Sequence, residues 1–381
     1  MITALVNGRV LTEAGVIEDR VVLIEDGRIL ALADAAPEGA RIQDLSEGLL
    51  LPGFIDTQVN GGGGVLFNDA PTVETIERIG AAHRRFGTTG FLPTLISDDL
   101  SVVRQAIKAV DEAIARGVPG VLGIHVEGPF LNARRKGIHD STKFRALDDE
   151  AFEVLTGLGR GRTLVTLAPE TTTPETIARL AAAGIIVSAG HTNATYATIR
   201  SALDNGLRGF THLFNAMSPL THREPGVVGA ALEDRHAWCG LIVDGRHVAP
   251  PVLRITMAAR PRDRLMLVTD AMPSVGTDET TFVLQGRAIS VRNGVCVDEH
   301  GTLAGSHLDM ASAVRNTVGL TGVSLAEASL MASGSPAAFL RLETERGAIA
   351  PGRRADLVLA DDELRVFETW IDGRPSGARF A

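Results

Sequence analysis

Residues 184–192 read GIIVSAGHT, a short apolar run that stops at an ionisable side chain, His191. Residues 264–271, RLMLVTDA, repeat the design and stop at Asp270. A short apolar run between turn residues is typical of a strand buried in a parallel sheet. In a parallel barrel, groups at the carboxyl ends of the strands face the mouth, where substrates bind. The two segments therefore indicate an α/β protein with a polar site at its strand ends.

Six further segments share this design, and amphipathic stretches lie between most of them. The other strand candidates are LLPGFIDTQV (50–59), TTGFLPTLI (88–96), GVLGIHVEG (120–128), TLVTLAPE (163–170), GFTHLFN (209–215) and WCGLIVDG (238–245). Several of the stretches between them end at glycine, as helices often do; examples are 73–87, 100–117, 174–184 and 194–206. Eight such alternating units predict a closed (β/α)8 barrel of the TIM type.

The two ends of the chain have a different pattern. Residues 1–51 are short strand candidates joined by NG and DG turns, and residues 345–381 are again rich in strand candidates. Because the edge strands of the first segment need partners, we predict that both ends build one small β-sandwich satellite domain. The barrel is expected over residues 52–344, with a β excursion near residues 279–303.

Composition limits the classes of function that remain. The 381 residues are 45% hydrophobic with a net charge of -9, which fits an enzyme-sized globular protein and argues against nucleic-acid binding. Cys239 and Cys296 show no CxxC spacing, so a reducing, cytoplasmic location is expected. Residues 1–11, MITALVNGRVL, do not read as a signal peptide, and no apolar run predicts a membrane span.

The ends of the predicted strands carry an unusual number of polar side chains. Among them, Glu127, His191 and His212 supply one carboxylate and two imidazoles, a set that suits Zn²⁺ or another borderline divalent ion. Any one histidine is more often a hydrogen-bonded structural residue, but three strand ends at one barrel mouth favour a metal site. Asp270 could cap the next helix or form an ion pair. Beside a metal, its expected role is proton transfer.

Two basic or imidazole side chains in mouth loops suggest anion binding. Arg223 in THREPG and His247 in DGRHV are placed to meet a phosphate. The run GGGG at residues 61–64 could let a backbone approach a phosphate, but a flexible turn is the better interpretation.

Seven motifs in order along the chain make a specific resemblance. They are LPGFID (51–56), HVEGPF (125–130), SAGHT (188–192), THLFNAM (211–217), REPG (223–226), VTDAM (268–272) and GTLAGS (301–306). In this order the chain resembles the N-acetylglucosamine-6-phosphate deacetylases of the amidohydrolase superfamily. The resemblance implies a metal-dependent barrel enzyme that hydrolyses the acetamide of N-acetyl-D-glucosamine 6-phosphate to D-glucosamine 6-phosphate and acetate.

The resemblance also implies roles for single residues. It makes Glu127, His191 and His212 the metal ligands and Asp270 the general acid and base. It implies a homodimer in which Arg223 reaches the phosphate in the neighbouring site. The substrate-binding positions that it implies are Gln58, Asn60, His139, Asn215, Ala216, Arg223, His247, Leu303, Ala304, Gly305 and Ser306.

One departure from the wider superfamily bears on the number of metal ions. Where many amidohydrolases carry His-x-His after the first strand, this chain has Gln58-Val59-Asn60, and amides replace imidazoles poorly as ligands. The fourth strand ends at Glu170 and offers no lysine. We therefore expect one divalent ion per subunit, Zn²⁺ first and Fe²⁺ as the alternative.

Three other functions remain open at this point. A deacetylase of N-acetylgalactosamine 6-phosphate or a cyclic-amide hydrolase could use the same metal and Asp270, because both act on an amide. A need for a phosphate on the substrate would exclude the cyclic-amide hydrolase. A non-catalytic scaffold would be expected to lack a ligand or the aspartate, and this chain keeps them all.

Overall fold

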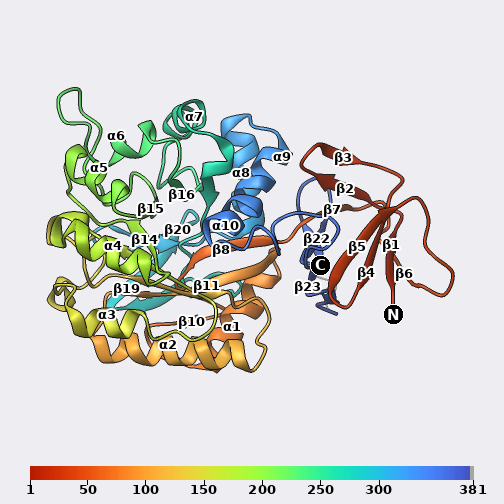
Figure 1. Ribbon diagram of the computed structural model, residues 1–381, viewed down its shortest axis with the longest axis horizontal. Coiled ribbons are helices and arrows are strands. Elements are labelled where there is room, and N and C mark those ends of the chain that lie inside the picture. The colour runs from red at the N-terminus through yellow and green to blue at the C-terminus, as the bar shows by residue number, and fades with distance from the viewer. Residues whose placement is uncertain (378–381) are drawn as a thin grey trace.

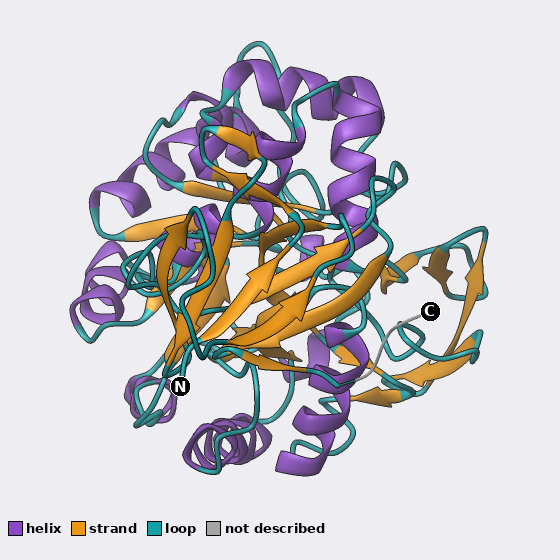
Figure 2. Cartoon of the chain, turned by 90° about the vertical axis from the view of Figure 1, so that its right-hand side faces the viewer, coloured by secondary structure: helices purple, strands orange, loops and turns teal. Residues whose placement is uncertain are grey.

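Residues 1–377 are described by a computed structural model (Figure 1). Residues 378–381, at the end of the expected C-terminal β segment, lie outside the described residues. Eight parallel strands form one sheet in chain order, which confirms the predicted TIM-like α/β barrel. Figure 2, viewed from the side of the two chain ends, shows strands across the middle of the molecule and helices around much of their edge. The barrel strands are β8 (Phe54–Val59), β11 (Thr88–Ile96), β12 (Gly123–Glu127), β13 (Arg162–Leu167), β14 (Ile186–Ala189), β15 (Leu207–Phe210), β16 (Trp238–Leu241) and β17 (Leu265–Leu267).

The first and last strands of the barrel meet through a buried carboxylate. Asp56 in β8 accepts hydrogen bonds from the amide and hydroxyl of Thr269, at 3.3 and 2.5 Å. The amide of Asp270 donates to the carbonyl of Gln58 at 3.0 Å, and that of Asn60 donates to Ala271 at 3.0 Å. Burial raises the pKa of Asp56 to about 7 despite these hydrogen bonds. The seam between first and last strand is thus closed at the carboxyl ends.

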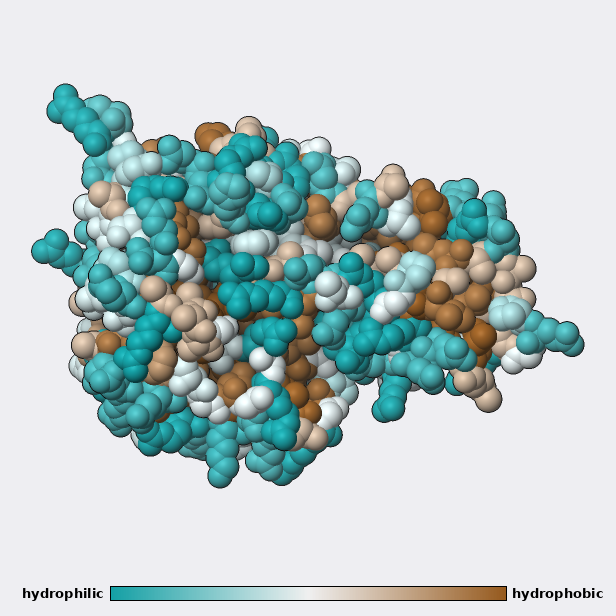
Figure 3. Space-filling model, in the orientation of Figure 1, coloured by the Kyte–Doolittle hydropathy of each residue, from teal (hydrophilic) through white to brown (hydrophobic). Residues whose placement is uncertain are grey.

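Amphipathic helices cover the outside of the barrel. In α2 (Leu100–Ala115), the buried residues Val103, Ala106, Ile107 and Val110 recur at helical spacing. Several helices begin at a threonine or aspartate whose side chain accepts an amide N–H three residues on. Hydrophilic residues cover most of the helical surface in the view of Figure 3. The other helices are α1 (Val73–Arg84), α3 (Asp149–Leu155), α4 (Pro174–Ala182), α5 (Tyr196–Asp204), α6 (Gly226–Glu233), α7 (Pro250–Ala259), α8 (Met310–Thr321), α9 (Leu325–Ala332) and α10 (Gly334–Phe339).

The amino-terminal end of the barrel is plugged by α10. Phe339 packs in one buried cluster with Ile55, Leu164, Trp238 and Met266, which lie near the starts of their strands. A closed lower end leaves the carboxyl ends of the strands as the open mouth. Short 3₁₀ turns within residues 1–377 are η1 (Ala133–Arg135), η2 (Ser141–Lys143), η3 (Pro169–Thr171) and η4 (Arg262–Arg264).

Two β-sheets lie beside the barrel and enclose a core that includes Leu5, Ile24, Leu357 and Trp370. One sheet has the order β5-β4-β1-β6 and the other β24-β23-β22-β7-β2-β3. β22 from the C-terminal segment pairs antiparallel with β7 from the N-terminal one, so both ends of the chain share a sheet. The strands are β1 (Thr3–Val6), β2 (Arg9–Thr12), β3 (Gly15–Ile17), β4 (Val21–Glu25), β5 (Arg28–Ala33), β6 (Arg41–Asp44), β7 (Leu49–Pro52), β22 (Leu357–Ala360), β23 (Val366–Ile371) and β24 (Arg374–Pro375).

The structure divides the predicted first barrel strand, residues 50–59, at Gly53. β7 lies in the outer sheet, and β8 begins the barrel at Phe54. A Cβ at Gly53 would lie 2.1 Å from the hydroxyl oxygen of Thr89, so only glycine fits at this crossing. The sequence does not reveal the break between the two strands, because the apolar run continues through it.

The β excursion is an antiparallel sheet of four strands that ends beside the seam. It consists of β18 (Thr281–Leu284), β19 (Arg287–Arg292), β20 (Val295–Val297) and β21 (Leu303–Ser306). The amide of Ser306 donates to the carbonyl of Asp270 at 2.8 Å. The glycine run 61–64 forms a tight hairpin between β9 (Gly61–Gly62) and β10 (Val65–Leu66). Within residues 1–377, no helix is long and apolar enough to cross a membrane.

We predict that Asp56→Ala lowers the free energy of unfolding by about 2–4 kcal/mol, because it leaves buried donors of the seam without an acceptor. Asp56→Asn should lose less, since its amide oxygen still accepts. Urea unfolding followed by tryptophan fluorescence measures the difference. Asp44→Ala, which removes an exposed carboxylate, serves as the control, and equal losses in Asp56→Ala and Asp44→Ala would contradict the role of the seam.

Candidate active site

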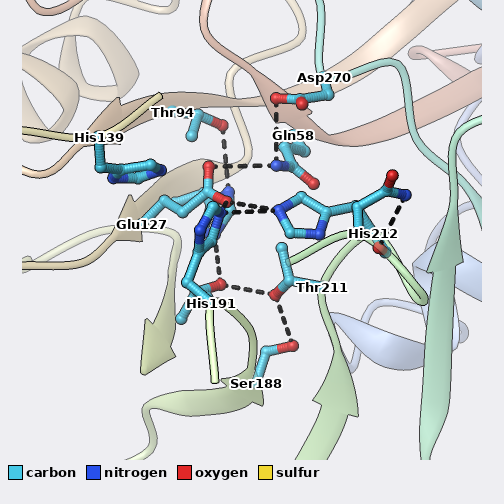
Figure 4. Close-up of polar contacts among 12 residues, drawn as sticks. Gln58, Thr94, Glu127, His139, Ser188, His191, Thr211, His212 and Asp270 are labelled. Atoms are coloured by element: carbon cyan, nitrogen blue, oxygen red, sulfur yellow. Dashed lines mark hydrogen bonds and ion pairs between the residues drawn. The ribbon is translucent and has the colours of Figure 1, made fainter. Parts of the chain in front are cut away.

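The mouth of the barrel gathers the ionisable groups that end its strands (Figure 4). Glu127 is the last residue of β12, His191 lies just beyond β14, and His212 lies just beyond β15. The Glu127 Oε1 atom lies 3.2 Å from Nε2 of His191 and 2.9 Å from Nε2 of His212. The two Nε2 atoms are 3.1 Å apart. Three buried atoms of ligand type, from three strand ends, thus face one another.

The backbone at these positions is strained. His191, His212 and Asp270 have φ angles of 48°, 31° and 53°, a left-handed region that non-glycine residues seldom occupy. Strain of this kind concentrates at functional sites, where the surrounding structure holds a side chain in one direction.

The hydrogen bond to His191 decides which of its nitrogens carries the proton. Nδ1 of His191 lies 2.8 Å from the carbonyl oxygen of Arg135. Because a carbonyl only accepts, Nδ1 carries the hydrogen, and the lone pair of Nε2 faces Glu127. Burial alone would raise the pKa of Glu127, but the two neighbouring imidazoles hold it well below its usual range. The donor set, one carboxylate oxygen and two imidazole nitrogens, therefore fits a divalent cation.

His139 lies close to Glu127 and His191, but its hydrogen bonds suit it to a different role. One ligand-type atom from each of Glu127, His139 and His191 lies within 4.8 Å of the others. However, Nδ1 of His139 accepts the amide N–H of Ser97 at 3.3 Å, and the Ser97 hydroxyl lies 2.8 Å from it. Burial holds the pKa of His139 well below its usual range, so the neutral ring carries its proton on Nε2. This favours His139 as a hydrogen-bond donor and His212 as the third ligand.

Two amides at the end of β8, those of Gln58 and Asn60, hold Asp270 beside this group. Nε2 of Gln58 donates to Oε2 of Glu127 at 3.1 Å and to Oδ1 of Asp270 at 3.2 Å. Nδ2 of Asn60 donates to the same Asp270 oxygen at 2.6 Å. Burial and the charge of Glu127 raise the pKa of Asp270 to about 6. Asp270 is thus a fixed carboxylate suited to accept and return a proton.

The remaining predicted residues lie at varying distances from this centre. Nδ1 of His247 contacts Asp244 at 2.6 Å, and the His247 side chain lies near enough to Asp270 to act on it electrostatically. Asn215 donates to the carbonyl of His212 at 3.2 Å. Ala216, with φ of 52°, accepts the amide N–H of Thr192 at 3.1 Å.

The segment from Leu303 to Ser306, which includes Ala304, is β21, beside the backbone of Asp270. Gly305 has a φ of 60°, and a Cβ there would lie 2.5 Å from the Met272 side chain. Arg223 is exposed, and it forms no hydrogen bond or ion pair with any residue in 1–377. The described chain therefore brings the other predicted residues to the mouth but leaves Arg223 on a surface loop.

Sequence reasoning missed the residue that fixes the loop of His191. Glu170 accepts hydrogen bonds from Asn132 at 2.8 Å, from the Thr192 hydroxyl at 2.5 Å and from the Asn193 amide at 2.6 Å. In the sequence, Glu170 stands out only as the end of a predicted strand that offers no lysine. A carboxylate at a fourth strand end was the signal that could have marked it as a support for the neighbouring loop.

The chain is similar to known proteins over nearly its whole length. The amidohydrolase family matches residues 49–375. The N-acetylgalactosamine-6-phosphate deacetylase of Shewanella sp. (strain ANA-3) is 44% identical over 98% of this chain and 97% of its own. The crystal structure of the N-acetylglucosamine-6-phosphate deacetylase from Pasteurella multocida has a TM-score of 0.95 and 35% identity, over 99% of this chain and 100% of its own. A mutant of the Mycobacterium smegmatis enzyme in complex with N-acetyl-D-glucosamine-6-phosphate has a TM-score of 0.90 and 34% identity, over 98% of both chains.

A parallel barrel with ligand-type side chains at its strand ends and a carboxylate beside them defines a hydrolase of the metal-dependent barrel class. The chain belongs to the amidohydrolase family, and the family resemblance of its motifs is confirmed.

We predict that His212→Ala and His139→Ala separate metal binding from catalysis. His212→Ala should lose tightly bound zinc, because a ligand is gone, whereas His139→Ala should keep about one zinc per chain and lose activity. Elemental analysis after gel filtration, with acetate release measured on the same samples, provides the comparison. Loss of zinc in His139→Ala with retention in His212→Ala would exchange the two roles, and two tight ions per wild-type chain would refute a single site.

Proposed function

We propose that this chain hydrolyses the acetamide of N-acetyl-D-glucosamine 6-phosphate to D-glucosamine 6-phosphate and acetate. The observation that carries the proposal is Asp270, held by Gln58 and Asn60 beside the three ligand-type atoms. The deacetylase names of the relatives and the sugar-phosphate complex of the M. smegmatis mutant support the choice of substrate.

We infer that Glu127, His191 and His212 hold one divalent cation per chain, Zn²⁺ first and Fe²⁺ as the alternative. When bound, such a cation polarises an amide carbonyl and lowers the pKa of water. The amides of Gln58 and Asn60 argue for a single ion, because both already donate to carboxylates and leave no imidazole for a second.

The chain's own side chains account for the proton movements. Asp270 accepts the proton that the attacking water gives up as the new C–O bond forms. It returns that proton to the sugar nitrogen as the C–N bond breaks, so that the amine leaves as a neutral group. Gln58 and Asn60 fix the carboxylate for both transfers, and the Nε2–H of His139 is a donor for a substrate oxygen. The raised pKa of Asp270 suits it to both roles near neutral pH.

A second candidate substrate is N-acetyl-D-galactosamine 6-phosphate. The Shewanella relative with that printed activity is 44% identical to this chain over nearly its full length. The two sugars differ at one hydroxyl configuration, away from the acetamide, so the same catalytic groups serve both.

We predict that Asp270→Asn lowers kcat by at least ~10²-fold while zinc content and substrate binding are retained. The reason is that asparagine keeps the size and hydrogen-bond pattern of the side chain but cannot carry the proton. Steady-state acetate release and equilibrium binding of the substrate measure the two quantities. Turnover near that of the wild type would remove Asp270 from the mechanism.

We further predict that efficient acetate release depends on the 6-phosphate and that Arg223 is the residue that recognises it. A planar guanidinium suits a dianionic phosphate in a protein of net charge -9. Arg223→Ala should cost about 2–4 kcal/mol in kcat/KM for the phosphorylated sugar and leave weak turnover of the unphosphorylated sugar almost unchanged. The four substrates, both epimers with and without phosphate, are assayed together; equal losses on phosphorylated and unphosphorylated sugars would make Arg223 structural.

Because Arg223 lies on a surface loop, we propose that it serves the site of a second subunit in a homodimer. Mixing Arg223→Ala chains with Asp270→Asn chains should then restore activity, since one site of the hybrid has an intact Asp270 and a partner with an intact Arg223. Absence of rescue in confirmed hybrids would place the arginine in its own subunit's site.

A further inference from the structure

A small cavity lies on the barrel axis between the candidate ligands and the α10 plug. Its lining extends from His212 at the mouth to Phe339 at the closed end. Polar side chains of Gln58, Ser188 and Thr211 take part in the lining. The volume is about 10 Å³, close to the space that one water molecule needs.

Two polar atoms of residues that line this cavity have no hydrogen-bond partner within residues 1–377. They are Nδ1 of His212, a donor once Nε2 serves as a ligand, and Oε1 of Gln58, an acceptor. Both side chains are buried, with 3% and 2% of their residues' surface exposed. The carbonyl of His212 lies beside its own ring but makes no hydrogen bond of normal geometry with Nδ1, and it accepts the backbone N–H and the side-chain amide of Asn215.

The two histidines proposed as ligands therefore differ in whether the second ring nitrogen has a hydrogen-bond partner. Histidines that bind metals almost always donate their other ring N–H to a carboxylate, a carbonyl or a water. His191 does so to the carbonyl of Arg135 at 2.8 Å. The protein offers His212 no equivalent acceptor within the described chain, but it does offer a cavity with room for one.

A chain of hydrogen bonds across the barrel reaches the same cavity (Figure 4). Nδ1 of His125 lies 3.2 Å from the Thr94 hydroxyl, and its Nε2 lies 2.8 Å from the Thr166 hydroxyl. The Thr166 and Thr211 hydroxyl oxygens are 2.6 Å apart, and Thr211 donates to Ser188 at 2.8 Å. Because Thr211 uses its proton on Ser188, it accepts from Thr166, which in turn accepts from Nε2–H of His125. The chain thus runs in one direction and ends at the hydroxyl proton of Ser188.

We propose that one ordered water occupies the cavity and completes this network. It accepts from Nδ1–H of His212 and from the hydroxyl of Ser188, and it donates to Oε1 of Gln58. The water fixes the tautomer of His212 and joins this ligand to the amide that holds Asp270. The inference rests on the proposed role of His212 as a metal ligand.

Gly240 provides a way to displace the water without disturbing the fold. It lines the cavity, and a Cβ there would lie 3.4 Å from the nearest atoms, the amide of His212 and the side chain of Val268. These are ordinary contact distances, so Gly240→Ala should fold with its methyl group in the cavity. Gly319→Ala is the matched control, because a Cβ at Gly319 in α8 meets nothing within 4 Å.

The test measures zinc affinity and structure on the full-length chain. Competition with a chromophoric chelator should give a zinc dissociation constant at least ~10-fold weaker in Gly240→Ala than in the wild type and Gly319→Ala, the usual effect of losing a partner of a ligand. The thermal midpoint of the metal-free Gly240→Ala chain should not fall. A crystal structure of the zinc-loaded wild type should show the water bonded to His212, Gln58 and Ser188.

Ser188→Ala is the second variant and covers the case in which Gly240→Ala fails to fold. It removes one of three contacts to the water, so its zinc affinity should fall by less than that of Gly240→Ala. A wild-type cavity without water density, or zinc affinity unchanged in the variants, would refute the water while leaving the proposed function intact. A wild-type chain that neither binds zinc nor releases acetate would refute both.

Discussion

The seam between the first and last barrel strands rests on Asp56, and the geometry of the site follows from it. Asp56 lies two residues before Gln58 in β8, and its carboxylate also accepts the amide N–H of Gln58 at 3.1 Å. The same closure sets the backbone of Asp270 against that of Gln58. A shift of either strand by one residue would turn the amides away from the carboxylate they hold. The register at one buried interaction thus determines where the side chains of the candidate site meet.

The interior of the barrel changes from apolar to polar along its axis. Near the closed end, Phe339 and the aliphatic residues around it form an apolar layer. Above it lies a belt of hydroxyls and the buried His125, whose pKa burial lowers to about 4. Uncharged groups that satisfy one another add rigidity without placing another charge beneath the candidate ligands. This layering holds the strand ends that carry the candidate ligands against one another.

Sequence patterns predicted the barrel and most of the residues at its mouth, because strand period and parallel topology together dictate where strand ends lie. They could not find the break at Gly53, since the apolar run continues through it and only the approach of Thr89 forbids a side chain. Patterns in the sequence also could not show that His139 and His212 are suited to different roles. The difference depends on which ring nitrogen of His139 carries the proton, and Ser97, which is distant in the sequence, decides this by donating to Nδ1. Arg223 shows the remaining limit: a residue proposed to act in another subunit has no partner within its own described chain.

The pairing of β22 with β7 has a consequence for how the chain is made. Ribosomes release the N-terminal strands first, yet β7 gains its antiparallel neighbour only when β22 emerges. Across the same unit, the ion pair of Arg9 with Asp362 joins residues 353 positions apart. Until β22 has been synthesised, that side of β7 is an unpaired apolar edge of the kind that associates with other chains. The emergence of β22 thus ends a period in which the nascent protein is exposed to aggregation.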